Sequence, residues 1–155
     1  MKVSIRALWK VPAFCLAAGY ISFNVYVFLV SRFGITVLPD GSYTANQVAT
    51  TVFSFLLFGA TLLAGKYLFR NMTRKEVFFS ATIPVLFHLI LQTMQLLSSN
   101  YDFSFSIGLY FSYVNEWCSI ISSLLYSVTK NAWIGAFVVC FAPYLFVLMK
   151  KNRSM

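Results

Sequence analysis

Long apolar runs separated by short polar stretches dominate the chain. Four of these runs cover residues 11–30, 48–69, 78–97 and 132–149. Each is close to the roughly twenty residues that a helix needs to cross a bilayer. Because a segment inside lipid must satisfy its own backbone N–H and C=O groups, this pattern predicts four transmembrane helices.

A fifth segment, 107–128, combines apolar and polar residues. Its apolar positions recur at helical spacing, which predicts an amphipathic helix. Such a helix either lies on the outer membrane surface or crosses the membrane with its polar side turned inward. We therefore expect an all-α integral membrane protein with one polytopic domain, 1–155, built as a bundle of four transmembrane helices plus an outer amphipathic helix; the alternative is five transmembrane helices. The polar stripe of this segment consists of Ser112, Asn115, Glu116, Ser119, Ser122 and Ser123.

The distribution of basic residues favours four crossings. With a cytoplasmic N-terminus, ten basic residues fall on the inner side and only Arg32 and Lys130 lie outside, as positive inner loops require. A fifth crossing changes this balance to eight against four. The link 129–131 is nevertheless short enough for a transmembrane hairpin, which keeps the alternative open. The ten inner residues are Lys2, Arg6, Lys10, Lys66, Arg70, Arg74, Lys75, Lys150, Lys151 and Arg153.

Composition agrees with a membrane location and limits other classes. Of the 155 residues, 59% are hydrophobic and 10% are charged, which leaves too little polar surface for a soluble globule. The net charge of +8 sits in clusters at the ends of apolar runs, so we expect contact with anionic lipid head groups and no nucleic-acid partner. The chain's small size favours a bacterial cytoplasmic membrane, with both termini in the cytoplasm.

One predicted transmembrane helix carries a polar stripe. His88 and Gln92 are four residues apart and Gln95 lies three further on, so all three share a helical face with Pro84. Pro84 lacks an N–H and leaves the carbonyl of Ser80 without its usual partner. One interpretation is a ligand-binding groove in which His88, Gln92 and Gln95 hold a substrate. The other is that these side chains form hydrogen bonds between packed helices.

Two more polar residues are candidates for ligand binding. Asn24 lies near the middle of the run 11–30, where it would complete a cavity between the first three helices. Glu116 is the acidic residue of the amphipathic segment. On a surface helix it faces water, whereas in the five-helix alternative it lies inside the bundle and pairs with His88 in a proton or cation pathway.

Enzyme signatures are missing from the sequence. We find no nucleophile elbow, no glycine-rich phosphate loop and no paired metal-ligand motif. The three cysteines, Cys15, Cys118 and Cys140, are widely separated and form no C-x-x-C pair, so we interpret them as packing residues. No catalytic residue, metal site or cofactor is predicted. A lipid-modifying enzyme is a weaker hypothesis because His88 lies far from both head-group layers.

Two functions remain. The first is a small multi-pass transporter or membrane substrate-binding component with a polar intramembrane cavity. The alternative is a non-catalytic structural or accessory subunit. It would contact a membrane protein partner or a second copy, in addition to the lipid bilayer, through small residues such as Ala60 and Ala64.

Overall fold

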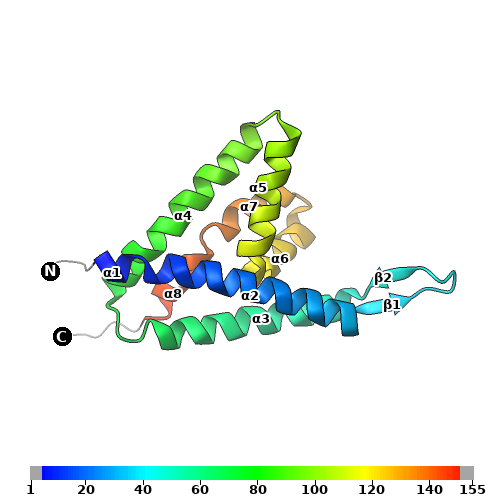
Figure 1. The fold of residues 1–155 in the computed structure, drawn as a ribbon, viewed down its shortest axis with the longest axis horizontal. Helices are drawn as coiled ribbons and strands as arrows, with labels where there is room; N and C mark the ends of the chain where they lie inside the picture. The colour runs from blue at the N-terminus through cyan, green and yellow to red at the C-terminus, as the bar shows by residue number, and fades with distance from the viewer. Residues whose placement is uncertain (1–4, 151–155) are drawn as a thin grey trace.

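The computed structural model describes residues 5–150 and is built mainly of helices (Figure 1). Three of the ten basic residues assigned to the inner side, Lys2, Lys151 and Arg153, lie outside this range. The helices are α1 (Ile5–Leu8), α2 (Lys10–Phe33), α3 (Gln47–Leu68), α4 (Arg74–Leu97), α5 (Tyr101–Val114), α6 (Ser119–Thr129), α7 (Ala132–Val139) and α8 (Leu145–Leu148). Two short 3-10 turns, η1 (Glu116–Cys118) and η2 (Ala142–Tyr144), and two strands, β1 (Ile35–Val37) and β2 (Tyr43–Ala45), complete the described chain.

Three helical segments are long and apolar enough to cross a membrane. They are Ile5–Phe33, which joins α1 to α2, then α3 and α4. The predicted runs 11–30, 48–69 and 78–97 are therefore confirmed as helices with the length and composition of membrane spans. A bundle of four such helices is not confirmed.

The start of α4 is fixed by a capping box. The hydroxyl of Thr73 accepts the backbone N–H of Glu76 (3.2 Å), and the Glu76 carboxylate accepts the backbone N–H of Thr73 (2.8 Å). This pairing satisfies two N–H groups that every helix start leaves open. As a result α4 begins at Arg74, four residues before the predicted 78, and the link from α3 is shorter than the gap 70–77 between the two predicted runs.

The remaining two predicted helices are broken. The segment 132–149 forms α7, η2 and α8 in succession, because Pro143 in η2 has no N–H to continue the helical hydrogen bonds of α7. The prediction of one amphipathic helix over 107–128 was wrong, since α5 ends at Val114 and α6 begins at Ser119. At this break the chain turns Trp117 and Cys118 into the core beside α2 and α3, where they are 1% and 0% exposed.

The connection from α2 to α3 is a β-hairpin, which the pattern of apolar runs did not predict. The strands pair antiparallel, with Ile35 opposite Ala45. Gly41 has a positive φ of 81°, which suits glycine at the tip of the turn. Beside it, Asp40 accepts the backbone N–H (2.9 Å) and the hydroxyl (2.7 Å) of Ser42, and these hydrogen bonds lower the pKa of Asp40.

The main core lies where α1, α8 and the α3–α4 link meet at one end of the molecule (Figure 1). The rings of Phe14, Phe69 and Phe146 contact one another edge to face, with centroids 5.3 to 5.5 Å apart. Fully buried Ser80 of α4 accepts the N–H of Val11 (3.0 Å) and donates to the carbonyl of Leu8 (2.7 Å). The start of α2 is thereby fixed against α4.

Candidate functional site

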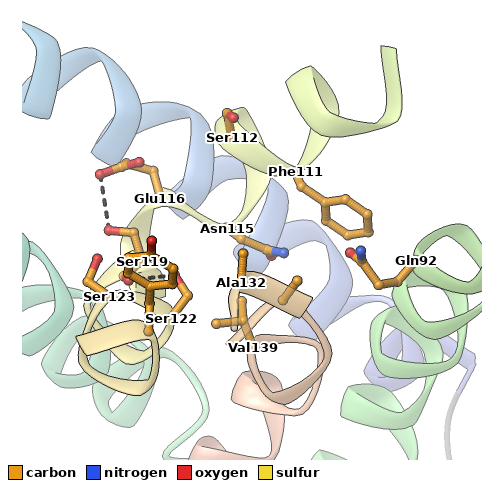
Figure 2. A pocket seen from close by; sticks show the side chains of 12 residues that line it. Gln92, Phe111, Ser112, Asn115, Glu116, Ser119, Ser122, Ser123, Ala132 and Val139 are labelled. Atoms are coloured by element: carbon orange, nitrogen blue, oxygen red, sulfur yellow. Dashed lines mark hydrogen bonds between the residues drawn. The ribbon is translucent and has the colours of Figure 1, made fainter. Parts of the chain in front are cut away.

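A pocket of about 400 Å³ lies between α4, α5, α6 and α7 (Figure 2). We call it the α4–α7 pocket. Every residue of the polar stripe predicted for 107–128 lines it, and Ser112 and Ser123 are exposed, so the stripe faces a pocket that is open to the surface. Its volume falls in the range typical of small-molecule sites. The other lining residues are Gln92, Phe111, Tyr126, Ala132, Ala136 and Val139.

The break between α5 and α6 and the tight turn after α6 shape this pocket. Lys130 ends α6 in the left-handed conformation (φ 54°), and the side chain of Asn131 caps α7 by accepting the N–H of Trp133 (3.0 Å). The two helices then pack closely at Gly135, where an added Cβ would lie 3.0 Å from the carbonyl oxygen of Ser122. Close packing keeps the stripe of α6 and the small residues of α7 on the same cavity.

The serine hydroxyls of the pocket direct their hydrogens to nearby acceptors in the chain. Ser112 donates to the carbonyl of Gly108 (3.0 Å), and Ser122 donates to the carbonyl of Ser119 (2.8 Å). Ser119 donates to a carboxylate oxygen of Glu116 (3.2 Å), as Figure 2 shows. A hydroxyl has one hydrogen and two lone pairs, so these groups keep acceptor capacity.

Gln92 and Gln95 connect α4 to α5. Gln92 is 3% exposed and donates its amide to the side-chain oxygen of Gln95 (3.1 Å). Gln95 in turn donates to the carbonyl of Ser104 in α5 (3.0 Å). Only Gln92 of this pair lines the pocket, and Figure 2 shows its amide on the side of the pocket opposite Glu116. Gln95 therefore holds Gln92 and contributes no lining atom.

His88 is buried between α4 and α5, outside the lining of the pocket. Its Nε2 lies 3.2 Å from the hydroxyl of Tyr110, and the ring packs edge to face on Phe111 with centroids 5.5 Å apart. Among the described residues, Nδ1 of this ring has no hydrogen-bond partner. The His88–Tyr110 contact joins two helices, which is the arrangement expected of a packing residue.

The structure does not bring all the candidate residues together. Asn24 is exposed on α2 and donates to the carbonyl of Tyr20 in its own helix (2.7 Å). No residue of α2 or α3 lines the pocket, so the cavity is on other helices than the predicted first three. Glu116 and His88 do not pair with each other, because Glu116 bonds Ser119 and His88 bonds Tyr110.

Two kinds of lining residue were missed in the sequence. Tyr126 follows Ser122 and Ser123 at helical spacing, so extending the stripe by one turn would have found it. Ala132 and Ala136 carry no polar signal, and only the close packing of α6 on α7 places them at the cavity. Across residues 5–150 no cluster of three or more His, Cys, Asp or Glu side chains has the arrangement of a metal site.

No family model, curated protein or solved structure matches the chain. The functional argument therefore rests on the geometry of the α4–α7 pocket.

Proposed function

We propose that this chain is a multi-pass membrane protein that binds a small polar molecule in the α4–α7 pocket, as a transporter or a membrane substrate-binding component. The observation that carries this proposal is the convergence of six stripe residues and Gln92 on one cavity. Polar side chains are costly at membrane depth and concentrate there where a protein uses them. In α2 and α3, by contrast, the exposed side chains are mostly apolar.

The proposed membrane arrangement has four crossings, the last of them made in pieces. α2, α3 and α4 cross as single helices. The chain must then return from the far end of α4, because η2 and α8 pack against α4 near the end where α1 also lies (Figure 1). α5 has 14 residues and spans about 21 Å, too short for a hydrocarbon core of about 30 Å. The return is therefore shared among α5, the α6–α7 hairpin and α8.

Interrupted helices of this kind support a binding function. Irregular backbone at membrane depth is tolerated where it is buried in protein or lines a cavity. Both conditions apply to the break at Asn115 and Glu116, which line the pocket beside buried Trp117. In transporters, substrate sites form at discontinuous helices near the membrane midplane. We place both ends of the chain in the cytoplasm of a cell, since Lys150 and the basic α3–α4 link lie at one end.

Two serines one turn apart on α6 provide the test. Ser123 lines the pocket, whereas Ser127 is exposed outside it and bonds the carbonyl of Leu124. In Ser123→Leu the larger, apolar side chain occupies part of the pocket and removes one lining hydroxyl, and Ser127→Leu is the matched control. The measurement is thermal unfolding of the detergent-purified protein with amines, polyols, amides and carboxylic acids. A ligand at a hundred times its Kd stabilises by about 2.7 kcal/mol.

We expect at least one compound class to raise the Tm of the wild type and of Ser127→Leu, and to leave Ser123→Leu unchanged. If no class does so, or if Ser123→Leu keeps every shift, the α4–α7 pocket is not a ligand site.

An accessory subunit is the second candidate, and one surface of α3 favours it. Ala60 and Ala64 are exposed there, and nothing lies within 4 Å of a Cβ placed on Gly59. Small residues let a neighbouring helix approach closely. This function predicts that Ala60→Phe releases a co-purifying chain or a second copy, which light scattering of the detergent complex measures. Ser123→Leu would leave that assembly intact.

A further inference from the structure

Given a ligand in the α4–α7 pocket, as the proposed function holds, we infer that the ligand is a monovalent organic cation. Its ammonium group binds Glu116, and its hydrocarbon body packs against Phe111. The inference adds a substrate class to the proposed function and rests on it.

The charge of the pocket comes from one side chain. Glu116 is the only acidic residue of the lining, and the lining contains no Lys, Arg or His. Within residues 5–150 its carboxylate accepts a single hydrogen bond, from Ser119. A carboxylate has about four lone-pair sites, so most of its capacity is unused. A half-buried carboxylate without a cation is costly, and an ammonium ligand removes that cost.

Among residues 5–150, the surroundings of Glu116 supply no cation. Tyr26 of α2 faces it and bonds hydroxyls of α3, Cys118 follows it in the chain, and Tyr126 lies across the same pocket on α6. Phenol and thiol groups are neutral at physiological pH unless strongly perturbed. The carboxylate is therefore the one charged group that these elements direct to the site.

Hydrogen-bond polarity points the same way. The hydroxyls of Ser112 and Ser122 donate their hydrogens to backbone carbonyls, which leaves their lone pairs as acceptors. The carboxylate of Glu116 has only acceptors when it is ionised. An ammonium group is the complementary partner, with three donors and no acceptor. A carboxylate or phosphate ligand could use the amide and hydroxyl donors of Asn115 and Tyr126, but it would be repelled by the ionised carboxylate of Glu116.

The remaining wall is apolar, which distinguishes an organic cation from a bare metal ion. Phe111 lies across Asn115 from Glu116 (Figure 2), and Ala132, Ala136 and Val139 are the other apolar residues of the lining. Aromatic faces also attract cations. A hard metal ion prefers six or more oxygen ligands, whereas this cavity of about 400 Å³ offers one charged ligand, and its remaining oxygens belong to neutral hydroxyl and amide groups.

Matched compounds that differ in one group test the inference on the whole chain. We would titrate phenethylamine and tryptamine, the corresponding alcohols 2-phenylethanol and tryptophol, and the acids phenylacetate and indole-3-acetate into detergent-purified protein. Calorimetry would give each Kd. Because hydrogen bonds to charged groups are about twice as strong as neutral ones, we expect the amines to bind on the order of tenfold or more tightly than the alcohols.

The variant Glu116→Gln keeps the shape of the side chain and removes its charge. It should abolish the preference for amines and leave the binding of alcohols within about threefold. Protonating Glu116 at low pH should weaken amine binding in the wild type in the same way. The wild-type comparison of amine and alcohol needs no variant, so it stands even if Glu116→Gln does not fold.

The two proposals fail in different ways. If alcohols or acids bind as tightly as amines, or Glu116→Gln keeps the amine preference, the cation inference is overturned. The proposed function still stands in that case, provided that Ser123→Leu abolishes the binding. If none of the six compounds binds, the cation inference is overturned, while the broader compound screen decides the proposed function.

Discussion

The α2–α3 pair and the α4–α7 region are both helical, yet they use polar side chains in opposite ways. In the most apolar stretch of α3 only 11% of residues are buried against the rest of the chain, compared with 39% in α4. Asn24 of α2 and Thr51 of α3 bond carbonyls of their own helices. Gln92 and His88 of α4 instead bond other side chains, and Gln92 faces a cavity.

This difference separates a scaffold from a candidate site. A long helix whose polar groups are satisfied locally can face lipid on most of its surface. The α4–α7 region has two interruptions, and two of its polar side chains bond a neighbouring helix: His88 contacts Tyr110, and Gln95 donates to the carbonyl of Ser104. Apart from Gln92 of α4, the residues that line the α4–α7 pocket therefore belong to the interrupted segments and not to the long apolar helices.

The largest expected effect is in thiol labelling, which reports the side of the membrane on which the connections of each region are exposed. In a background without the three natural cysteines, Ser42→Cys at the hairpin and Ser99→Cys after α4 should react with a membrane-impermeant thiol reagent in intact cells. Asn71→Cys and Lys150→Cys should react only after permeabilisation, because positive segments stay inside. Labelling of Lys150→Cys in intact cells would show that the interrupted region does not return across the membrane.

A smaller but strong effect is expected where the two regions touch. An added Cβ on Gly19 of α2 would overlap the carbonyl oxygen of Val114 in α5, whereas a Cβ on Gly59 of α3 meets open space. Gly19→Ala should lower the free energy of unfolding by about 3 kcal/mol through overpacking. Gly59→Ala should raise it by about 0.5–1 kcal/mol, since alanine favours a helix.

Denaturant titration in detergent micelles measures both variants. Equal stabilities for Gly19→Ala and Gly59→Ala would mean that α2 and α5 do not approach as closely as the structure describes. The two regions would then not be in close contact at Gly19.

The smallest effect concerns the His88–Tyr110 contact. Tyr110→Phe leaves both ring nitrogens of His88 without a partner and should cost about 1–3 kcal/mol of unfolding free energy. The double variant His88→Leu with Tyr110→Phe removes both polar groups and should lie within about 1 kcal/mol of the wild type. The same titration, arranged as a double-mutant cycle, measures the coupling.

A double variant that is much less stable than Tyr110→Phe alone would contradict this account. It would show that His88 has a further partner, such as a bound molecule at Nδ1, and would bring His88 back among the candidate ligand-binding residues.

Features with local causes could be predicted from the sequence. The helices α2, α3 and α4 follow from uninterrupted apolar runs, because helix formation in lipid depends on length and hydropathy alone. The turn at Gly41 follows from its glycine and the neighbouring Asp40. The polar stripe from Ser112 to Ser123 also follows from spacing, and all of it lines the pocket.

Tertiary packing decided the rest. The stripe had two allowed environments, and only the packing of α6 on α7 and of η1 on α2 and α3 turned it toward a cavity. The break after Val114 accompanies the burial of Trp117 against α2 and α3, elements that lie far from it in sequence. His88 contacts Tyr110, which is 22 residues away in the chain, and not Glu116. Spacing along a helix fixes which side chains share a face, but their partners depend on which other elements pack against that face.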